Sequence, residues 1–216
     1  SPKLDLILGG GIPEGSFVIM AGPPKIGKTV TSLHFSGNAQ KRNRNIYYLN
    51  IEGRLKSRDL EGIPGLDIDK MQIIGSYKLD ATDEEKAKVD KSKILMADDY
   101  LSIAERKIKD DPGCVVIIDS ASQLLSEDEY NSNIDQQHRA PVAQLLSRFC
   151  KRVSNVLPIT GSIIIMIVHV VANTGGGHKT TSRTGGNKIQ YAVDVDLECK
   201  YTEKWKVGGS KDDPES

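Results

Sequence analysis

The stretch "FVIMAGPPKIGKT", residues 17–29, decides the fold that the sequence predicts. Its apolar residues 17–21 are typical of a buried strand, and they run directly into the loop "GPPKIGKT", residues 22–29. The loop fits the pattern G-x-x-x-x-G-K-[ST], in which backbone N–H groups and a lysine surround a chain of phosphates. Strand, loop and the helical stretch that follows therefore predict a P-loop that binds a nucleotide.

The residues of this loop suit a polyanion. Gly22 and Gly27 have no Cβ, so the backbone can turn its N–H groups toward phosphates. A helix that begins near Gly27 or Lys28 adds its positive dipole end. Lys28 is expected to reach the β- and γ-phosphates, and the Thr29 hydroxyl to bind Mg²⁺. ATP and Mg²⁺ are the predicted cofactors, and the predicted cofactor contacts are Gly22, Pro23, Pro24, Lys25, Ile26, Gly27, Lys28, Thr29, Val30 and Asp119.

Short apolar runs recur along the rest of the chain. They predict strands at 17–21, 46–51, 71–75, 114–119, 162–170 and 193–201. Several runs do not alternate with polar residues, which is typical of parallel strands buried on both faces. Helices are predicted over 28–41, 97–110 and 139–156, and a solvated helix or loop over 80–96. The sequence therefore predicts an α/β fold, a mostly parallel twisted sheet with helices on both faces.

Composition bounds the class of protein. With 216 residues, 38% apolar and 27% charged, the chain is expected to form one globular domain, residues 1–216, and its ends are expected to be boundaries of a fragment. The net charge of zero gives no indication of nucleic-acid binding. A local patch of basic residues, however, would matter more for such binding than the net charge of the chain. The three cysteines form no CxxC pair, so neither a zinc site nor a disulfide framework is expected.

The sequence also bears on the compartment. No apolar run approaches the ~20 residues of a membrane span, and no signal peptide opens the chain. A cytoplasmic protein without a membrane partner is expected, in a bacterium or a phage-infected host.

Two carboxylates end predicted strands. Asp119 follows "CVVII" and is expected to share Mg²⁺ with Thr29 through water; the alternative is a turn or helix-cap aspartate. The next residue is Ser120, where many P-loop ATPases have their water-activating glutamate. Glu52, at the end of "IYYLNIE", is therefore the candidate general base, and the alternative is a surface acid.

Four stretches beside the loop resemble motifs of the RecA recombinases. They are "LDLILGGGIPEG" (4–15), "IEGRL" (51–55), "VVIIDSASQL" (115–124) and "TGGNKIQYAVDVDLE" (184–198). "AGPPKIGKT" (21–29) and "IVHVVAN" (167–173) are similar to the phage UvsX type in particular, with a basic residue inside the loop and histidine where RecA has glutamine.

The resemblance covers nearly all of the chain and implies a RecA-like ATPase core. By matched position it implies that Lys28 and Thr29 bind phosphate and Mg²⁺, that Glu52 is the general base and that Asp119 is the Mg²⁺ partner. It also implies that His169 senses the γ-phosphate. The residues themselves agree, because His169 follows "IIIMIV", and nucleotide sites of open α/β sheets lie at strand ends. A half-buried structural histidine is the alternative.

Two polar stretches fall where the family's DNA-binding loops lie, at 131–139 and 170–186. Neither contains an aromatic residue, so contacts to the phosphate backbone are expected to dominate over base stacking. The predicted partners are single-stranded DNA and a homologous duplex, and the predicted contacts are Asn131, Asn133, Gln136, Gln137, His138, Arg139, Thr174, Gly175, Gly176, Gly177, His178, Lys179 and Arg183.

The prediction for function is an ATP-dependent strand-exchange recombinase that forms a helical homo-oligomeric filament in its full-length form. The chain departs from the family near "KSRDLEG" (56–62), where no aromatic residue stands to stack on adenine. The family's amino-terminal polymerisation segment and its last core strands are expected to lie outside this sequence. Two alternatives stay open. One is another RecA-fold ATPase, such as a hexameric helicase or a KaiC-like protein. The other is a nucleotide-gated binding or assembly module with little turnover.

Overall fold

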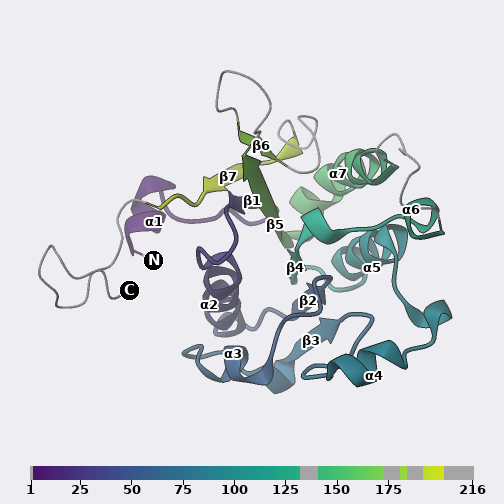
Figure 1. Ribbon diagram of the computed structural model, residues 1–216. Helices are drawn as coiled ribbons and strands as arrows, with labels where there is room; N and C mark the ends of the chain where they lie inside the picture. The colour runs from purple at the N-terminus through teal and green to yellow at the C-terminus, as the bar shows by residue number, and fades with distance from the viewer. Residues whose placement is uncertain (1, 132–140, 173–180, 184–191, 202–216) are drawn as a thin grey trace, which may run out of the picture.

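The computed structural model describes residues 2–131, 141–172, 181–183 and 192–201, and its centre is a parallel sheet. The strand order is β3-β2-β4-β5-β1-β7 (Figure 1). These strands are β1 (Phe17–Gly22), β2 (Ile46–Asn50), β3 (Met71–Ile74), β4 (Val115–Asp119), β5 (Ile163–Ala172) and β7 (Val195–Glu198). A short strand, β6 (Thr181–Arg183), pairs antiparallel with the end of β5. The prediction of a mostly parallel α/β sheet is confirmed.

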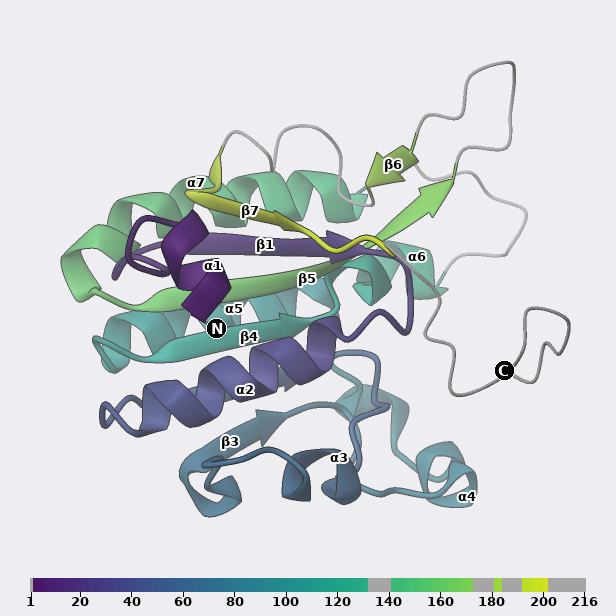
Figure 2. The ribbon, with the colours of Figure 1, turned by 90° about the vertical axis from the view of Figure 1, so that its left-hand side faces the viewer.

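Helices cover both faces of the sheet, as predicted. Helix α2 (Lys28–Gln40) lies on one face, and α5 (Ala97–Asp110) and α7 (Pro141–Thr160) lie side by side on the other (Figure 2). Shorter helices complete the chain: α1 (Pro2–Ile7), α3 (Ser57–Glu61), α4 (Asp83–Ala87) and α6 (Glu127–Asn131), with single 3₁₀ turns at 68–70, 91–93 and 121–123. None of the helices in the described ranges is long and apolar enough to cross a bilayer.

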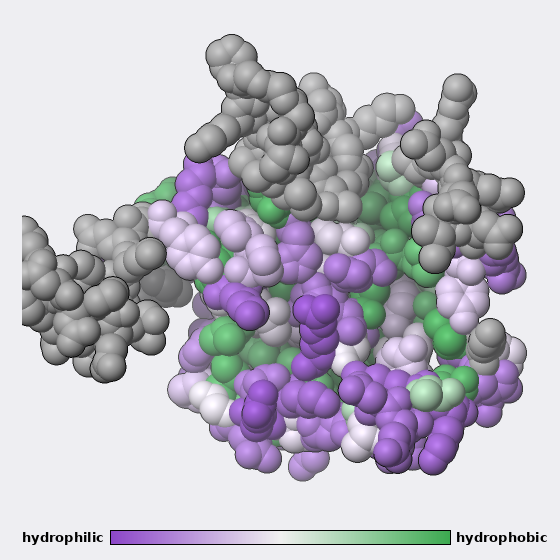
Figure 3. Space-filling view, viewed as in Figure 1, coloured by the Kyte–Doolittle hydropathy of each residue, from purple (hydrophilic) through white to green (hydrophobic). Residues whose placement is uncertain are grey.

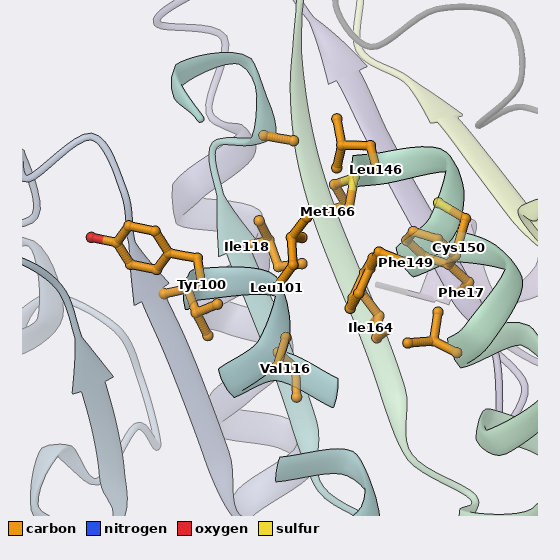
Figure 4. Close-up of a cluster of buried hydrophobic side chains, with 14 of the residues drawn as sticks. Phe17, Tyr100, Leu101, Val116, Ile118, Leu146, Phe149, Cys150, Ile164 and Met166 are labelled. Carbon is orange, nitrogen blue, oxygen red and sulfur yellow. The ribbon is translucent and has the colours of Figure 1, made fainter. Parts of the chain in front are cut away.

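Two apolar layers hold the helices on the sheet. Phe17, Val116 and Ile164 point to the α5–α7 side, where they pack with residues such as Phe149 (Figure 4). Their chain neighbours, among them Val18, Val115 and Ile165, point to the α2 side. Each strand thus buries successive residues on opposite faces, which explains why its apolar run does not alternate with polar residues.

The charged stretch 80–96 forms the short helix α4, capped by a reciprocal pair in which Thr82 accepts from the Glu85 N–H and Glu85 accepts from Thr82. Hydrophilic side chains gather on the part of the surface that lies over α3 and α4 (Figure 3). The expectation of a solvated helix or loop is confirmed.

Several predicted boundaries were wrong. The strand predicted at 162–170 continues to Ala172, and 181–183, predicted as part of a loop, form β6, because Val170 pairs with Arg183 and Ala172 with Thr181. The strand predicted at 193–201 is shortened to Val195–Glu198, the part that pairs with β1. The third predicted helix runs on to Thr160, and its last turn contains Pro158, which has no N–H to donate to the carbonyl four residues earlier.

Candidate active site

Residues 22–29 leave the carboxyl end of β1 and turn into α2. Gly27 is the N-cap of α2 with φ 92°, a left-handed conformation that glycine adopts without steric cost. Gly22 is required for space instead, since a Cβ there would lie 2.7 Å from the Cys199 carbonyl oxygen at the end of β7. The predicted helix start at Lys28 is confirmed.

Lys28 is the buried cation of the loop, with 4% of its surface exposed. Its Nζ donates to the carbonyl oxygens of Gly22, at 2.9 Å, and Pro23, at 2.6 Å. Burial lowers the pKa of the ammonium group, although electrostatic interactions with Cys199, Asp119 and Glu52 oppose this effect. The ammonium group is therefore held at the mouth of the loop by acceptors that a phosphate group could replace.

Asp119 and Thr29 meet beside the loop. The Thr29 Oγ1 donates to Asp119 Oδ2 at 2.7 Å, and the hydroxyl of Tyr48 donates to the same oxygen at 2.5 Å. Burial raises the pKa of the Asp119 carboxyl group, and the hydrogen bonds from Tyr48 and Thr29 partly offset that rise. The carboxylate thus lies at the carboxyl end of β4, next to the first turn of α2.

Glu52 lies on the neighbouring strand end. The backbone N–H groups of Ile51 and Glu52 both donate to the Asp119 carbonyl, which ties the end of β2 to the end of β4. The Oε1 of Glu52 accepts from Ser120 Oγ at 2.9 Å and lies 2.7 Å from His169 Nε2. Burial pushes the pKa of Glu52 upward, but the hydrogen bonds from His169 and Ser120, together with electrostatic interactions with His169 and Arg54, leave the pKa below its ordinary value.

His169 connects the two sides of the site. Its Nδ1 lies 3.3 Å from Lys28 Nζ while its Nε2 faces Glu52. Its backbone N–H donates to Ser122 Oγ at 2.8 Å, which anchors β5 to the turn after β4. The prediction that His169 ends its strand was wrong, because β5 runs on to Ala172; pairing with β1, however, ends at Gly22 and His169.

The residues present suit a magnesium ion and its phosphate partners. Thr29 and Asp119 supply oxygen ligands, the type that Mg²⁺ prefers, and Mg²⁺ in proteins commonly uses one or two such groups together with phosphates and water. Within the described ranges, His, Cys, Asp and Glu side chains form no group of three or more that could bind a metal ion.

The predicted DNA contacts fall largely outside the described residues. Asn131 is the exposed last residue of α6, and the backbone of Arg183 pairs with Val170 in β6. The structure does not describe Asn133, Gln136, Gln137, His138, Arg139, Thr174, Gly175, Gly176, Gly177, His178 or Lys179.

Three hydroxyl groups of the site escaped the sequence analysis. In the sequence, Tyr48 is one apolar residue of a predicted buried strand. Only the structure shows that its hydroxyl donates to Asp119 and so belongs to the site. In the sequence, Ser120 stands out only because it is not a glutamate, and Ser122 does not stand out. The position of the two serines just after the strand-end Asp119 was their one available signal, and no such signal marks Tyr48.

The strand–loop–helix unit of residues 17–40, set in a parallel sheet, defines the class as P-loop α/β proteins. The sequence matches the family model of the RecA N-terminal domain over residues 1–213, and the chain therefore belongs to the RecA family.

Relatives in this family share about a quarter of their residues with the chain. Protein RecA of Acholeplasma laidlawii (strain PG-8A) is 27% identical, with 96% of this chain and 58% of that protein covered. Protein RecA of Mycoplasma pneumoniae is 26% identical, with 95% of this chain and 56% of that protein covered. Protein RecA of Clostridium beijerinckii is 25% identical, with 96% of this chain and 53% of that protein covered. The chain thus spans about half the length of the curated relatives it matches.

Proposed function

We propose that this chain is a single-domain ATPase core of a DNA-dependent recombinase. The observation that carries the proposal is one cluster in a RecA-family chain. His169 contacts both Lys28 and Glu52. Asp119 accepts from the Thr29 hydroxyl through its side chain and from the Glu52 N–H through its backbone carbonyl. Because the chain belongs to the RecA family, the proposal extends to a cytoplasmic protein that forms a helical filament on single-stranded DNA. A homologous duplex is the proposed second partner.

In this proposal residues 22–30 bind the triphosphate of ATP. The N–H groups of the loop and the start of α2 face the phosphates, and Lys28 exchanges the Gly22 and Pro23 carbonyls for phosphate oxygens. Thr29 would hold Mg²⁺ directly, and Asp119 would hold it through water. Bound Mg²⁺ supplies neutralisation of the charge that builds up on the phosphate oxygens.

Glu52 is the proposed general base for the attacking water. Two hydrogen bonds, from Ser120 and His169, favour its ionised form, which is the form that can accept a proton. His169 is the proposed γ-phosphate sensor, because it lies next to both Lys28 and Glu52. Its strand leads on toward 170–186, where DNA contacts are proposed.

The test is ATP binding and phosphate release by the intact protein, with and without single-stranded DNA. Lys28→Ala is expected to lower ATP affinity or turnover by at least about tenfold, because a charge that faces the phosphates is lost. Lys41→Ala is the matched control, since it removes an exposed lysine at the other end of α2. Unchanged binding and turnover in the Lys28 variant would refute the P-loop assignment. If the rate of ATP turnover is the same with and without single-stranded DNA, the chain is an ATPase that does not depend on DNA.

A further inference from the structure

The buried hydroxyl of Tyr48 lies at the centre of the candidate site, yet the reaction as proposed does not use it. Tyr48 has 1% of its surface exposed and lies in the middle of β2, on the face that α2 covers. Its Cα pairs with Ile117 of β4, and Asp119 lies two residues further along that strand on the same face. An aromatic side chain can reach this diagonal neighbour across a pair of strands.

The contact is specific for one carboxylate oxygen. Tyr48 and Thr29 both donate to Oδ2 of Asp119, at 2.5 Å and 2.7 Å. Among the described residues, none donates to Oδ1. A phenol can only donate toward a carboxylate, so the Tyr48 hydroxyl is the donor in this contact.

We propose that Tyr48 is a positioning residue for the magnesium-facing carboxylate, because its hydroxyl holds Oδ2 of Asp119 and leaves Oδ1 as the oxygen that turns to metal-bound water. This inference rests on the proposed function. Groups that orient a metal-binding carboxylate typically change metal affinity by about 10–100-fold when they are removed. Tyr48 thus affects the affinity for Mg²⁺, whereas the loop at 22–29 binds the phosphates.

The same strand offers a matched control. Tyr47 is the chain neighbour of Tyr48 and points to the opposite face, where its hydroxyl donates to Asp111 Oδ2 at 2.8 Å. Tyr47→Phe and Tyr48→Phe therefore make the same chemical change, the loss of one phenol-to-aspartate hydrogen bond, on opposite faces of β2.

The experiment titrates Mg²⁺ against binding of a fluorescent ATP analogue by the intact protein, with circular dichroism to check the fold. Tyr48→Phe is expected to raise the Mg²⁺ concentration at half-maximal effect roughly tenfold, and to change affinity in excess EDTA less than about twofold. Tyr47→Phe is expected to match the parent in both measurements. In an Asp119→Asn background, Tyr48→Phe is expected to add little, because the two side chains act as one unit.

A Mg²⁺ midpoint equal to that of the parent would overturn the inference. So would an equal loss of metal-free affinity, which would mean that the hydroxyl only supports the fold, or a full effect that persists in the Asp119→Asn background. If the parent binds the analogue no better than Lys28→Ala under any condition, the proposed function itself fails and this inference falls with it.

A measurement on the unsubstituted protein covers the case in which Tyr48→Phe does not fold. With ¹³C at the tyrosine Cζ, the Tyr48 signal is assigned by elimination, using Phe variants of the other tyrosines. The signal is expected to shift when Mg²⁺ is added to the nucleotide complex, because the carboxylate that accepts its hydrogen bond takes up the metal-bound water. A signal that does not move would overturn the inference.

Discussion

The Lys28 ammonium group has three partners within the site, two carbonyls of its own loop and one ring nitrogen of His169. A buried cation needs such acceptors, because desolvation without them would favour its neutral form. The loop is thus arranged around its lysine. Binding of a triphosphate would exchange one set of oxygen acceptors for another.

Glu52 is the residue at which binding and hydrolysis separate. Glu52→Gln keeps the shape of the side chain and its contacts with Ser120 and His169, but it removes basicity. ATP affinity is expected to stay within about threefold, and the hydrolysis rate to fall roughly 10²–10⁴-fold, the usual contribution of a general base.

Single-turnover phosphate release by the intact protein measures this effect. Glu61→Gln is the control, because Glu61 is an exposed acid at the end of α3. Hydrolysis that is unaffected in the Glu52 variant would show that Glu52 is a surface acid, and the base would have to be sought elsewhere.

Among the elements, α5 and α7 are joined by polar contacts as well as by their apolar faces. Glu105 of α5 lies 2.5 Å from Lys109 on the same helix and 2.9 Å from Arg152 of α7. Burial pushes the pKa of Glu105 upward, but the hydrogen bonds from Lys109 and Arg152 outweigh it and leave the pKa below its ordinary value. The ionised form of Glu105 therefore stabilises the helix pair.

Glu105→Gln is expected to lower the free energy of unfolding at pH 7 by about 1 kcal/mol, a small value because both cations are largely exposed and screened. A depressed folded-state pKa stabilises the protein above the ordinary glutamate pKa of 4.5, and this contribution is lost as pH falls through the folded value. The difference between variant and parent should therefore shrink below about pH 4.

Urea unfolding at a series of pH values measures the difference. Glu84→Gln provides the comparison, since Glu84 lies exposed on α4. A gap between the Glu105 variant and the parent that stays constant down to pH 3 would contradict the role of the ionised carboxylate.

At the scale of the whole molecule, the zero net charge means that any affinity for DNA has to come from a local set of cations. The candidates are Lys179 and Arg183, predicted from the sequence. Replacing both with alanine is expected to weaken single-stranded DNA binding with either ATP or ADP bound. The slope of log affinity against log salt should fall by roughly 0.7 for each lost phosphate contact.

Fluorescence anisotropy of labelled single-stranded DNA across a salt series tests this prediction in the intact protein. Replacing Lys88 and Lys93, two exposed lysines near α4, removes the same charge elsewhere. If both double variants reduce the salt slope equally, the region around β6 is not a specific DNA site.

Much of the fold could be predicted from sequence because each element carries its own local pattern. Helix 97–110 was predicted with its observed bounds, and strands β1 to β4 within one residue at each end. The end of β5 and β6 could not be predicted in this way. Residues 181–183 are polar and have no apolar pattern that marks a strand, and only their pairing with residues 170–172 shows how far β5 extends.

By itself the sequence determined the class of fold, the loop at 22–29 and which polar side chains end buried strands, because apolar runs, glycines and the residues that follow them are local features. Only the tertiary structure decided that Tyr48 and Thr29 share one oxygen of Asp119, and that His169 lies between Lys28 and Glu52. These contacts depend on strand order and register. A shift of one residue in β2 would turn Tyr48 to the opposite face of the sheet.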